Sequence, residues 1–258
     1  MLEQMTEKFI AIIPARYAST RFPGKPLALL GGKPIIQWVY ERVHLVFPEV
    51  VVATDDDRII DCVKQFGGKA VMTSSNHHSG TDRCREAYEK SGSCAEVIVN
   101  VQGDEPFIHP DQLKAVMGCF NSKDCDIATL VKPFKSDDTM EALLSPNTPK
   151  VVLDSKGYAM YFSRSVIPYL RNIPQEEWLQ HHVFYKHIGL YAYRAEALKR
   201  ITSFAQTPLE LCESLEQLRW LENGLKIKTA LTDRETVGID TPADLKRAKD
   251  FLRQQEEQ

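Results

Sequence analysis

The chain has 258 residues, of which 43% are hydrophobic and 26% charged, and its formal net charge is -3. That length and apolar content suffice for one large α/β domain with a buried core. A slightly acidic chain is atypical of nucleic-acid-binding proteins, and no apolar run is long enough to cross a bilayer. Because residues 1–8 are polar and the six cysteines form no CxxC pair, we expect a cytoplasmic protein with reduced thiols and no membrane or nucleic-acid partner.

Short β-branched runs alternate with helical patterns in the first half of the chain. The expected strands there are 9–13, 50–53, 70–72, 97–101 and 127–131, and the expected helices are 35–46, 57–66, 82–89 and 110–120. This βαβα order predicts a doubly wound, mostly parallel sheet. After Pro133 the rhythm changes. The elements expected there are strands 150–154, 158–163, 187–193 and 227–231, an irregular segment 171–183, and helices 208–223 and 241–253.

The first predicted strand leads into a loop that carries three cations, Arg16, Arg21 and Lys25. A cationic loop after a strand is a common way to bind phosphates, whereas the alternative is a solvated surface loop. Lys25 follows a glycine, but Pro26 stands where a Walker A motif has Ser or Thr, and no GxGxxG pattern is present. The loop therefore predicts another type of triphosphate site, in which cations neutralise departing pyrophosphate.

Two aspartates are candidates for binding a metal ion. Asp104 follows strand 97–101, at the end of a parallel strand where ligands bind, and Mg²⁺ prefers carboxylates together with phosphate oxygens. Glu105 is a weaker candidate, and a turn before Pro106 is the structural alternative for both acids. Asp240 precedes the last predicted helix, and its spacing alone favours a helix cap, formed by Asp240 or Thr241.

Two further segments open predicted helices. Ser79, Gly80 and Thr81 offer hydroxyls and free N–H groups, which predict either a base- or ribose-binding turn or an ordinary helix cap. Residues 55–57 read Asp-Asp-Asp and contain the Asp-x-Asp pattern that a metal-dependent glycosyltransferase would need. We interpret that run mainly as a helix cap.

Polar side chains in the second half suit an acidic, hydroxyl-rich sugar, although such polar stripes are usually solvated. His187 and Tyr191 alternate along one face of a predicted strand, and Arg164 follows another strand. The predicted helix 208–223 would place Glu213, Glu216 and Gln217 on one face.

Motifs spread over nearly the whole chain resemble the 3-deoxy-manno-octulosonate cytidylyltransferase (CMP-Kdo synthetase) family. In chain order they are Ile13-Pro14-Ala15-Arg16, Ser19-Thr20-Arg21, Pro23-Gly24-Lys25-Pro26, Ser79-Gly80-Thr81, Val101-Gln102-Gly103-Asp104-Glu105-Pro106, Tyr161-Phe162-Ser163-Arg164, His187-Ile188-Gly189-Leu190-Tyr191, Pro208-Leu209-Glu210, Leu215-Glu216-Gln217-Leu218-Arg219 and Asp240-Thr241-Pro242. One departure is Asp82, where the family often has Glu.

The resemblance implies a nucleotide-diphospho-sugar transferase-like α/β fold and a Mg²⁺-dependent reaction. In that reaction CTP and 3-deoxy-D-manno-octulosonate (Kdo) give CMP-Kdo and pyrophosphate for lipopolysaccharide biosynthesis, and the enzyme is a homodimer. Within a single α/β domain, residues 1–132 would bind the nucleotide, 133–225 would bind the sugar and form the dimer contact, and 226–258 would return to the main sheet.

The resemblance also implies roles for individual residues. Asp104 and Asp240 would bind the metal and act in catalysis with Lys25. The nucleotide would bind to Arg16, Ser19, Arg21, Lys25, Ser79, Gly80 and Thr81. Kdo would bind to Gln102, Arg164, His187, Tyr191, Glu213, Glu216 and Gln217.

Three alternatives stay open at this point. The acceptor can be another acidic sugar, such as a sialic acid or an amino-substituted Kdo. A catalytically silent nucleotide-binding protein is disfavoured because both aspartates are present, and a glycosyltransferase would depend on the acidic run 55–57. One sequence does not fix the number of magnesium ions.

Overall fold

The computed structural model describes residues 8–235 and 238–256, and the chain divides into two compact units. The first unit is 1–114 together with 236–258, and the second is 115–235. The division falls inside α5 (Pro110–Gly118). Strand β7 (Ile127–Pro133), which the sequence interpretation grouped with residues 1–132, therefore belongs to the second unit.

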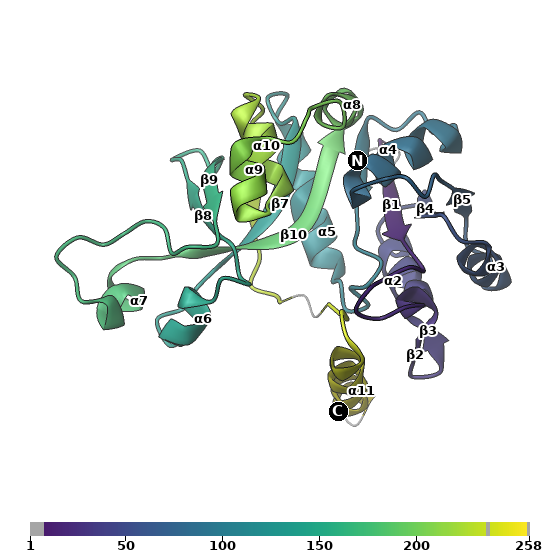
Figure 1. Cartoon of the computed structure of the whole chain (residues 1–258), viewed down its shortest axis with the longest axis horizontal. Coiled ribbons are helices and arrows are strands. Elements are labelled where there is room, and N and C mark those ends of the chain that lie inside the picture. Colours follow the sequence, from purple (N-terminus) through teal and green to yellow (C-terminus); the bar gives the residue numbers. More distant parts are fainter. Residues whose placement is uncertain (1–7, 236–237, 257–258) are drawn as a thin grey trace. The chain divides into compact units, whose positions relative to one another are not determined.

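The first unit is built on a parallel sheet. Its strand order is β6 (Val97–Asn100), β1 (Phe9–Ala15), β4 (Val50–Thr54) and β5 (Ala70–Met72). All residues of β4 and β6 are buried, as expected for strands of a parallel sheet that helices cover. The helices that pack on the sheet are α2 (Ile35–His44), α3 (Asp57–Gln65) and α4 (Gly80–Ser91), labelled in Figure 1.

A second apolar cluster anchors the C-terminal helix α11 (Pro242–Glu256) within the first unit. Ala248 and Leu252 of this helix pack with Leu30 of strand β2 (Leu29–Leu30), which pairs with β3 (Lys33–Pro34). Gly31 lies so close to this helix that a Cβ there would be 2.6 Å from a methyl group of Leu252. The close packing fixes where the chain enters α11.

The second unit has a mixed sheet. Its strand order is β11 (Ile227–Leu231), β7, β10 (Tyr185–Arg194), β8 (Lys150–Leu153) and β9 (Ala159–Ser163). Only the β11–β7 pair is parallel among these pairings of the second unit's described strands. In Figure 1, β10 is the long green strand.

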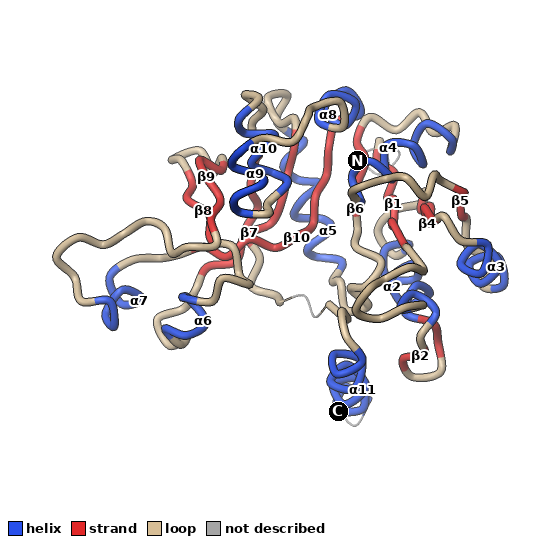
Figure 2. Tube along the Cα trace, in the orientation of Figure 1, coloured by secondary structure: helices blue, strands red, loops and turns tan. Residues whose placement is uncertain are grey.

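Several short helices of the second unit were not predicted. They are α6 (Met140–Leu144), α7 (Trp178–His181) and α8 (Ala195–Ile201), with 3-10 turns at Cys119–Asn121 and Gln175–Glu177. Helices of four to seven residues are too short to show a helical period. The segment predicted as irregular is therefore only partly so. A long loop, tan in Figure 2, leads from β9 to the 3-10 turn before α7.

The predicted helix 208–223 is wrong as a single element. The structure has α9 (Pro208–Glu213) and α10 (Glu216–Glu222), and between them Ser214 adopts a left-handed conformation with φ 50°. The break has a tertiary cause, because the Glu213 carboxylate accepts hydrogen bonds from Ser163 Oγ at 2.6 Å and Arg164 N at 2.8 Å. Glu213 and Glu216 therefore do not share one continuous helical face.

The remaining predicted strands and helices are present with small shifts at their ends, and the α/β fold class with a mostly parallel sheet flanked by helices is confirmed. Among the described residues, no helix combines the length and apolar character that a bilayer crossing requires.

Candidate active site

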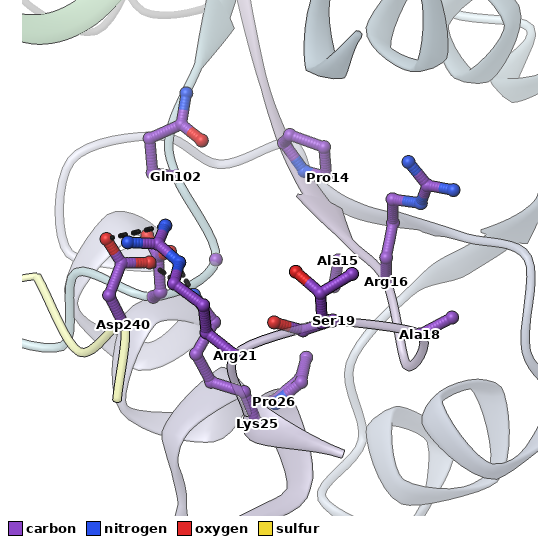
Figure 3. A pocket seen from close by; sticks show the side chains of 13 residues that line it. Pro14, Ala15, Arg16, Ala18, Ser19, Arg21, Lys25, Pro26, Gln102 and Asp240 are labelled. Carbon is purple, nitrogen blue, oxygen red and sulfur yellow. Dashed lines mark hydrogen bonds and ion pairs between the residues drawn. The ribbon is translucent and has the colours of Figure 1, made fainter. Parts of the chain in front are cut away.

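A pocket of about 370 Å³ lies in the first unit, where β1 and β6 end and the cationic loop begins (Figure 3). It contains the predicted cations, both predicted aspartates and the predicted glutamine. The lining residues are Pro14, Ala15, Arg16, Ala18, Ser19, Thr20, Arg21, Lys25, Pro26, Gln102, Gly103, Asp104 and Asp240.

Two glycines give the pocket its shape. A Cβ at Gly103 would lie 2.8 Å from the backbone oxygen of Pro14, so only glycine lets the turn after β6 approach the end of β1 this closely. Gly24 has φ +71° and precedes the short 3-10 helix Lys25–Leu27, so it turns the cationic loop back toward the pocket. The two turns bring Asp104 and Lys25 together.

The two predicted metal ligands converge on one lysine. Lys25 Nζ donates to Asp104 Oδ2 at 2.5 Å and to Asp240 Oδ1 at 3.1 Å, and Arg21 contacts the other oxygen of Asp240 at 3.1 Å. Figure 3 shows Arg21 and Asp240 facing each other. Burial on its own lowers the pKa of Lys25, but the charges and hydrogen bonds of Asp104 and Asp240 outweigh it and raise that pKa. Lys25 is therefore a permanent cation in this pocket.

Asp240 reaches the pocket because a neighbour caps α11. Thr241 Oγ1 accepts from Asp244 N at 3.2 Å, and the Asp244 carboxylate accepts from Thr241 N at 2.8 Å and Asp240 N at 3.1 Å. Ile239 N also donates to the backbone oxygen of Asp104 at 2.9 Å. The cap preference that spacing alone gave to Asp240 is wrong, because Thr241 caps the helix and leaves the Asp240 carboxylate for Lys25 and Arg21.

Arg16 and Ser19 line the same pocket. Arg16 Nε lies 3.8 Å from Asp55 Oδ2, and Asp55 is also bound by the buried Arg83 at 2.8 Å. Ser19 Oγ accepts from Phe22 N at 3.3 Å, so its hydroxyl shapes the loop and keeps its own proton to donate. Both residues are placed to contact an anion in the pocket.

The other predicted nucleotide-binding turn is a helix cap in this structure. Ser79 Oγ accepts from Asp82 N, and Asp82 accepts from Ser79 N, which is a complete capping box at the start of α4. Gly80 packs against the Pro14 ring, since a Cβ there would lie 3.4 Å from it. The role of Ser79, Gly80 and Thr81 in binding nucleotide stays a prediction.

The acidic run 55–57 has structural partners. Asp56 accepts from Arg58 N at 3.0 Å and caps α3, and Asp55 pairs with Arg83. These partners account for the Asp-x-Asp pattern without a glycosyltransferase site.

In the second unit, two predicted sugar-binding residues form one network. The Arg164 guanidinium donates to the backbone oxygens of Glu213 at 2.6 Å, Pro146 at 2.9 Å and Ser214 at 3.2 Å. Glu213 in turn binds Ser163 and the Arg164 backbone. The network holds the junction between α9 and α10 against the end of β9.

The sequence analysis missed Lys150, which is fully buried in β8 and donates to the backbone oxygen of Ser145 at 2.8 Å. Burial lowers the pKa of Lys150, while the charge of Glu213 raises it. A lysine after an apolar stretch gives no sign in the sequence that it is buried.

His187 and Tyr191 lie on β10 within an aromatic cluster. The His187 ring is 5.1 Å from Phe162 and 5.3 Å from Tyr191, and Tyr191 meets Trp220 of α10 edge-on at 5.0 Å. Burial lowers the pKa of His187 to about 4 and raises that of Tyr191. Both side chains are therefore neutral near pH 7.

The remaining predicted sugar-binding residues of this unit lie on α10. Gln217 is 4% exposed, and its Nε2 has no hydrogen-bond partner among the residues that the structure describes. Glu216 is bound to Arg219 at 2.8 Å. An unsatisfied buried amide is costly, so Gln217 is a ready hydrogen-bond donor for a ligand.

The cytidylyltransferase family model matches residues 10–227. The chain is 64% identical over 246 residues to 3-deoxy-manno-octulosonate cytidylyltransferase of Parabacteroides distasonis, with 95% of this chain and 98% of the relative covered. The chain belongs to the 3-deoxy-manno-octulosonate cytidylyltransferase family. A family member from Thermodesulfovibrio yellowstonii is 47% identical over 251 residues, with 94% and 97% covered.

A solved structure supports the same conclusion. CMP:2-keto-3-deoxy-manno-octonic acid synthetase complexed with CTP matches this chain with a TM-score of 0.87 and 40% identity, covering 96% of this chain and 99% of that one. The family resemblance that the motifs indicated is confirmed, and this cytidylyltransferase is an enzyme of the nucleotidyltransferase class.

Proposed function

We propose that this enzyme transfers the cytidylyl group of CTP to Kdo, forming CMP-Kdo and pyrophosphate for lipopolysaccharide biosynthesis. The observation that carries the proposal is the convergence of Asp104 and Asp240 on Lys25, within a pocket that Arg16 and Arg21 also line. The names of relatives up to 64% identical support CTP and Kdo as substrates.

The donor set of the pocket fits Mg²⁺. Among the described residues, His, Cys, Asp and Glu form no group of three that would make an all-protein metal site. Two aspartates beside a phosphate-binding loop are the usual protein share of a Mg²⁺ site, in which water and phosphate oxygens supply the other ligands. Asp104 and Asp240 would hold the ion, which would polarise phosphoryl oxygens and neutralise their charge.

The cations of the pocket act on the leaving group. The anomeric hydroxyl of Kdo attacks the α-phosphorus of CTP in line, the bond to the β-phosphate oxygen breaks, and the hydroxyl proton is lost. Negative charge grows on pyrophosphate as it departs, and Arg16, Arg21 and Lys25 stabilise that charge, with Ser19 donating a hydrogen bond. The raised pKa of Lys25 supports a role as a fixed charge rather than as a base.

We propose that Kdo is bound by Gln102 in the first unit and by side chains of the second unit. Support is most direct for Gln217, whose buried amide has no partner among the described residues. Arg164 and Glu213 act through the network that already orders the end of β9. The set in the second unit is Arg164, His187, Tyr191, Glu213, Glu216 and Gln217.

We also propose that the enzyme is a cytoplasmic homodimer. Large apolar side chains of the second unit are exposed, including Met160 at 64%, Leu211 at 61% and Tyr169 at 76%. Such side chains mark association surfaces when they gather together. The six cysteines are all free, as expected in a reducing compartment. Light scattering across a dilution series tests the dimer, and a monomer at micromolar concentration contradicts it.

The function is tested by pyrophosphate release. CTP, UTP and ATP are each combined with Kdo, an amino-substituted Kdo or a sialic acid, with and without Mg²⁺. We expect release from CTP and Kdo that requires Mg²⁺. Release with another sugar acid but not with Kdo would overturn the acceptor assignment, and release that does not need a divalent ion would overturn the metal assignment.

A further inference from the structure

The strand that carries His187 has two extra residues beside its neighbour. On β10, Ile188 pairs with Leu130 and Tyr191 pairs with Thr129, so Gly189 and Leu190 have no counterparts on β7. The fully buried Thr129 faces this bulge. Its Oγ1 lies 2.9 Å from the Leu190 backbone oxygen, 3.2 Å from the Ile188 backbone oxygen and 3.0 Å from His187 Nε2.

Counting protons decides how these four atoms bind. A threonine hydroxyl has one proton to donate, and backbone oxygens can only accept. If that proton went to His187 Nε2, two carbonyl oxygens would face the hydroxyl oxygen with no proton between them. The favourable arrangement gives the proton to the carbonyls, mainly that of Leu190, and lets Oγ1 accept from a protonated Nε2.

The arrangement leaves the other ring nitrogen of His187 as an acceptor. A neutral imidazole carries one N–H, so a proton on Nε2 leaves a lone pair on Nδ1. No hydrogen bond to Nδ1 comes from any residue in the described parts of the chain. The rings of Phe162 and Tyr191 restrain the orientation of the imidazole.

We propose that Thr129 is a positioning residue that fixes His187 in the Nε2–H tautomer, so that Nδ1 accepts a hydrogen bond from a hydroxyl of the acceptor sugar. This inference rests on the proposed function, in which His187 contacts Kdo. It specifies the recognised group, because an unprotonated Nδ1 binds a hydroxyl donor and repels a carboxylate. The low pKa of His187 agrees with a neutral ring.

The tautomer is read directly by NMR. Protein labelled with ¹⁵N-histidine gives two-bond ¹H–¹⁵N correlations that distinguish Nε2–H from Nδ1–H, and His187→Gln identifies the signal. We expect Nε2–H in the wild type and in Thr129→Ser, which keeps the hydroxyl. Thr129→Val keeps the volume but removes the hydroxyl, and we expect a growing share of Nδ1–H. An Nδ1–H signal in the wild type overturns the proposal, and this test does not require the valine variant to fold.

Kinetics test the consequence for binding. Losing one oriented hydrogen bond should raise KM for Kdo about tenfold in Thr129→Val, with kcat and KM for CTP much less affected and Thr129→Ser near the wild type. Unchanged KM for Kdo in the valine variant, with the tautomer altered, would overturn the role in sugar binding. Wild-type protein that releases no pyrophosphate with Kdo would refute the proposed function, while the NMR result would still decide the Thr129–His187 relation.

Discussion

Lys25 donates to Asp240 across 215 positions of the sequence, at a distance of 3.1 Å. The first turn of α11 therefore completes a pocket that begins at the end of β1. The packing of Leu252 and Ala248 against Leu30 holds that helix in place. Catalysis in this enzyme thus depends on the docking of its C-terminal helix within the first unit.

Replacing either aspartate by asparagine should abolish most activity while leaving the fold intact. Asparagine keeps the size of the side chain but removes the charge that Lys25 and the proposed Mg²⁺ bind. We expect kcat/KM to fall at least about a hundredfold in Asp104→Asn and in Asp240→Asn, with an unchanged circular dichroism spectrum. The exposed Asp137→Asn is the matched control, with activity like the wild type. Near-normal turnover in either site variant would remove that aspartate from the mechanism.

Gly103→Ala should damage both stability and activity. The new methyl group would lie 2.8 Å from the Pro14 backbone oxygen, and this backbone contact is relieved only by moving the turn that carries Asp104. We expect a loss of about 1–3 kcal/mol in the free energy of unfolding, measured in urea, together with lower kcat.

Gly118→Ala provides the control for this change. Gly118 ends helix α5, and a Cβ there meets nothing within 4 Å. We expect no loss of stability or activity, because alanine is the better helix former. Equal stabilities for the two alanine variants would contradict the close approach at Gly103.

The first unit was largely predictable because its signals are local. The apolar runs of β1 and β6, and the cations and acid that follow them, are continuous in the sequence, and the parallel order brings their ends together. The position of Asp240 was not predictable from spacing. Asp240 and Thr241 are both good capping residues, and only the bonds of Asp244 decide that Thr241 caps the helix.

The second unit was less predictable because its shape depends on long-range contacts. No glycine or proline marks the break at Ser214, which follows from the binding of Glu213 to β9. The bulge in β10 is likewise held by Thr129 on another strand. The motifs themselves were visible, but the partners of Arg164, Glu213 and His187 were not.

Ser214→Gly should stabilise the protein. Ser214 has φ 50°, a conformation that glycine adopts without steric cost, and its side chain makes no hydrogen bond within the described residues. We expect a gain of about 0.5–1 kcal/mol in the free energy of unfolding, with the α9–α10 junction and its contact to Arg164 preserved. Thermal and urea unfolding measure the gain. A destabilised glycine variant would show that the left-handed residue costs little here.

His187 should make stability depend on pH in the acidic range. Its pKa is about 4 in the folded protein and near 6.5 in the unfolded chain. Above pH 6.5 both states are neutral at this residue. As the pH falls from 6.5 toward 4, the unfolded chain takes up a proton that the folded protein does not, so the free energy of unfolding falls, and below pH 4 this contribution levels off. The loss attributable to His187 is up to about 3 kcal/mol.

The contribution of His187 is isolated by subtraction, because other groups titrate in the same range. Urea unfolding of the wild type and of His187→Gln is measured from pH 4 to 7, and we expect the wild type to lose more stability on acidification. His44→Gln, at an exposed position of α2, is the matched control and should follow the wild type. Parallel curves for the wild type and His187→Gln would mean that the imidazole takes up its proton as readily in the folded protein as in the unfolded chain. The ring would then be charged at mildly acidic pH and could no longer accept a hydrogen bond through Nδ1.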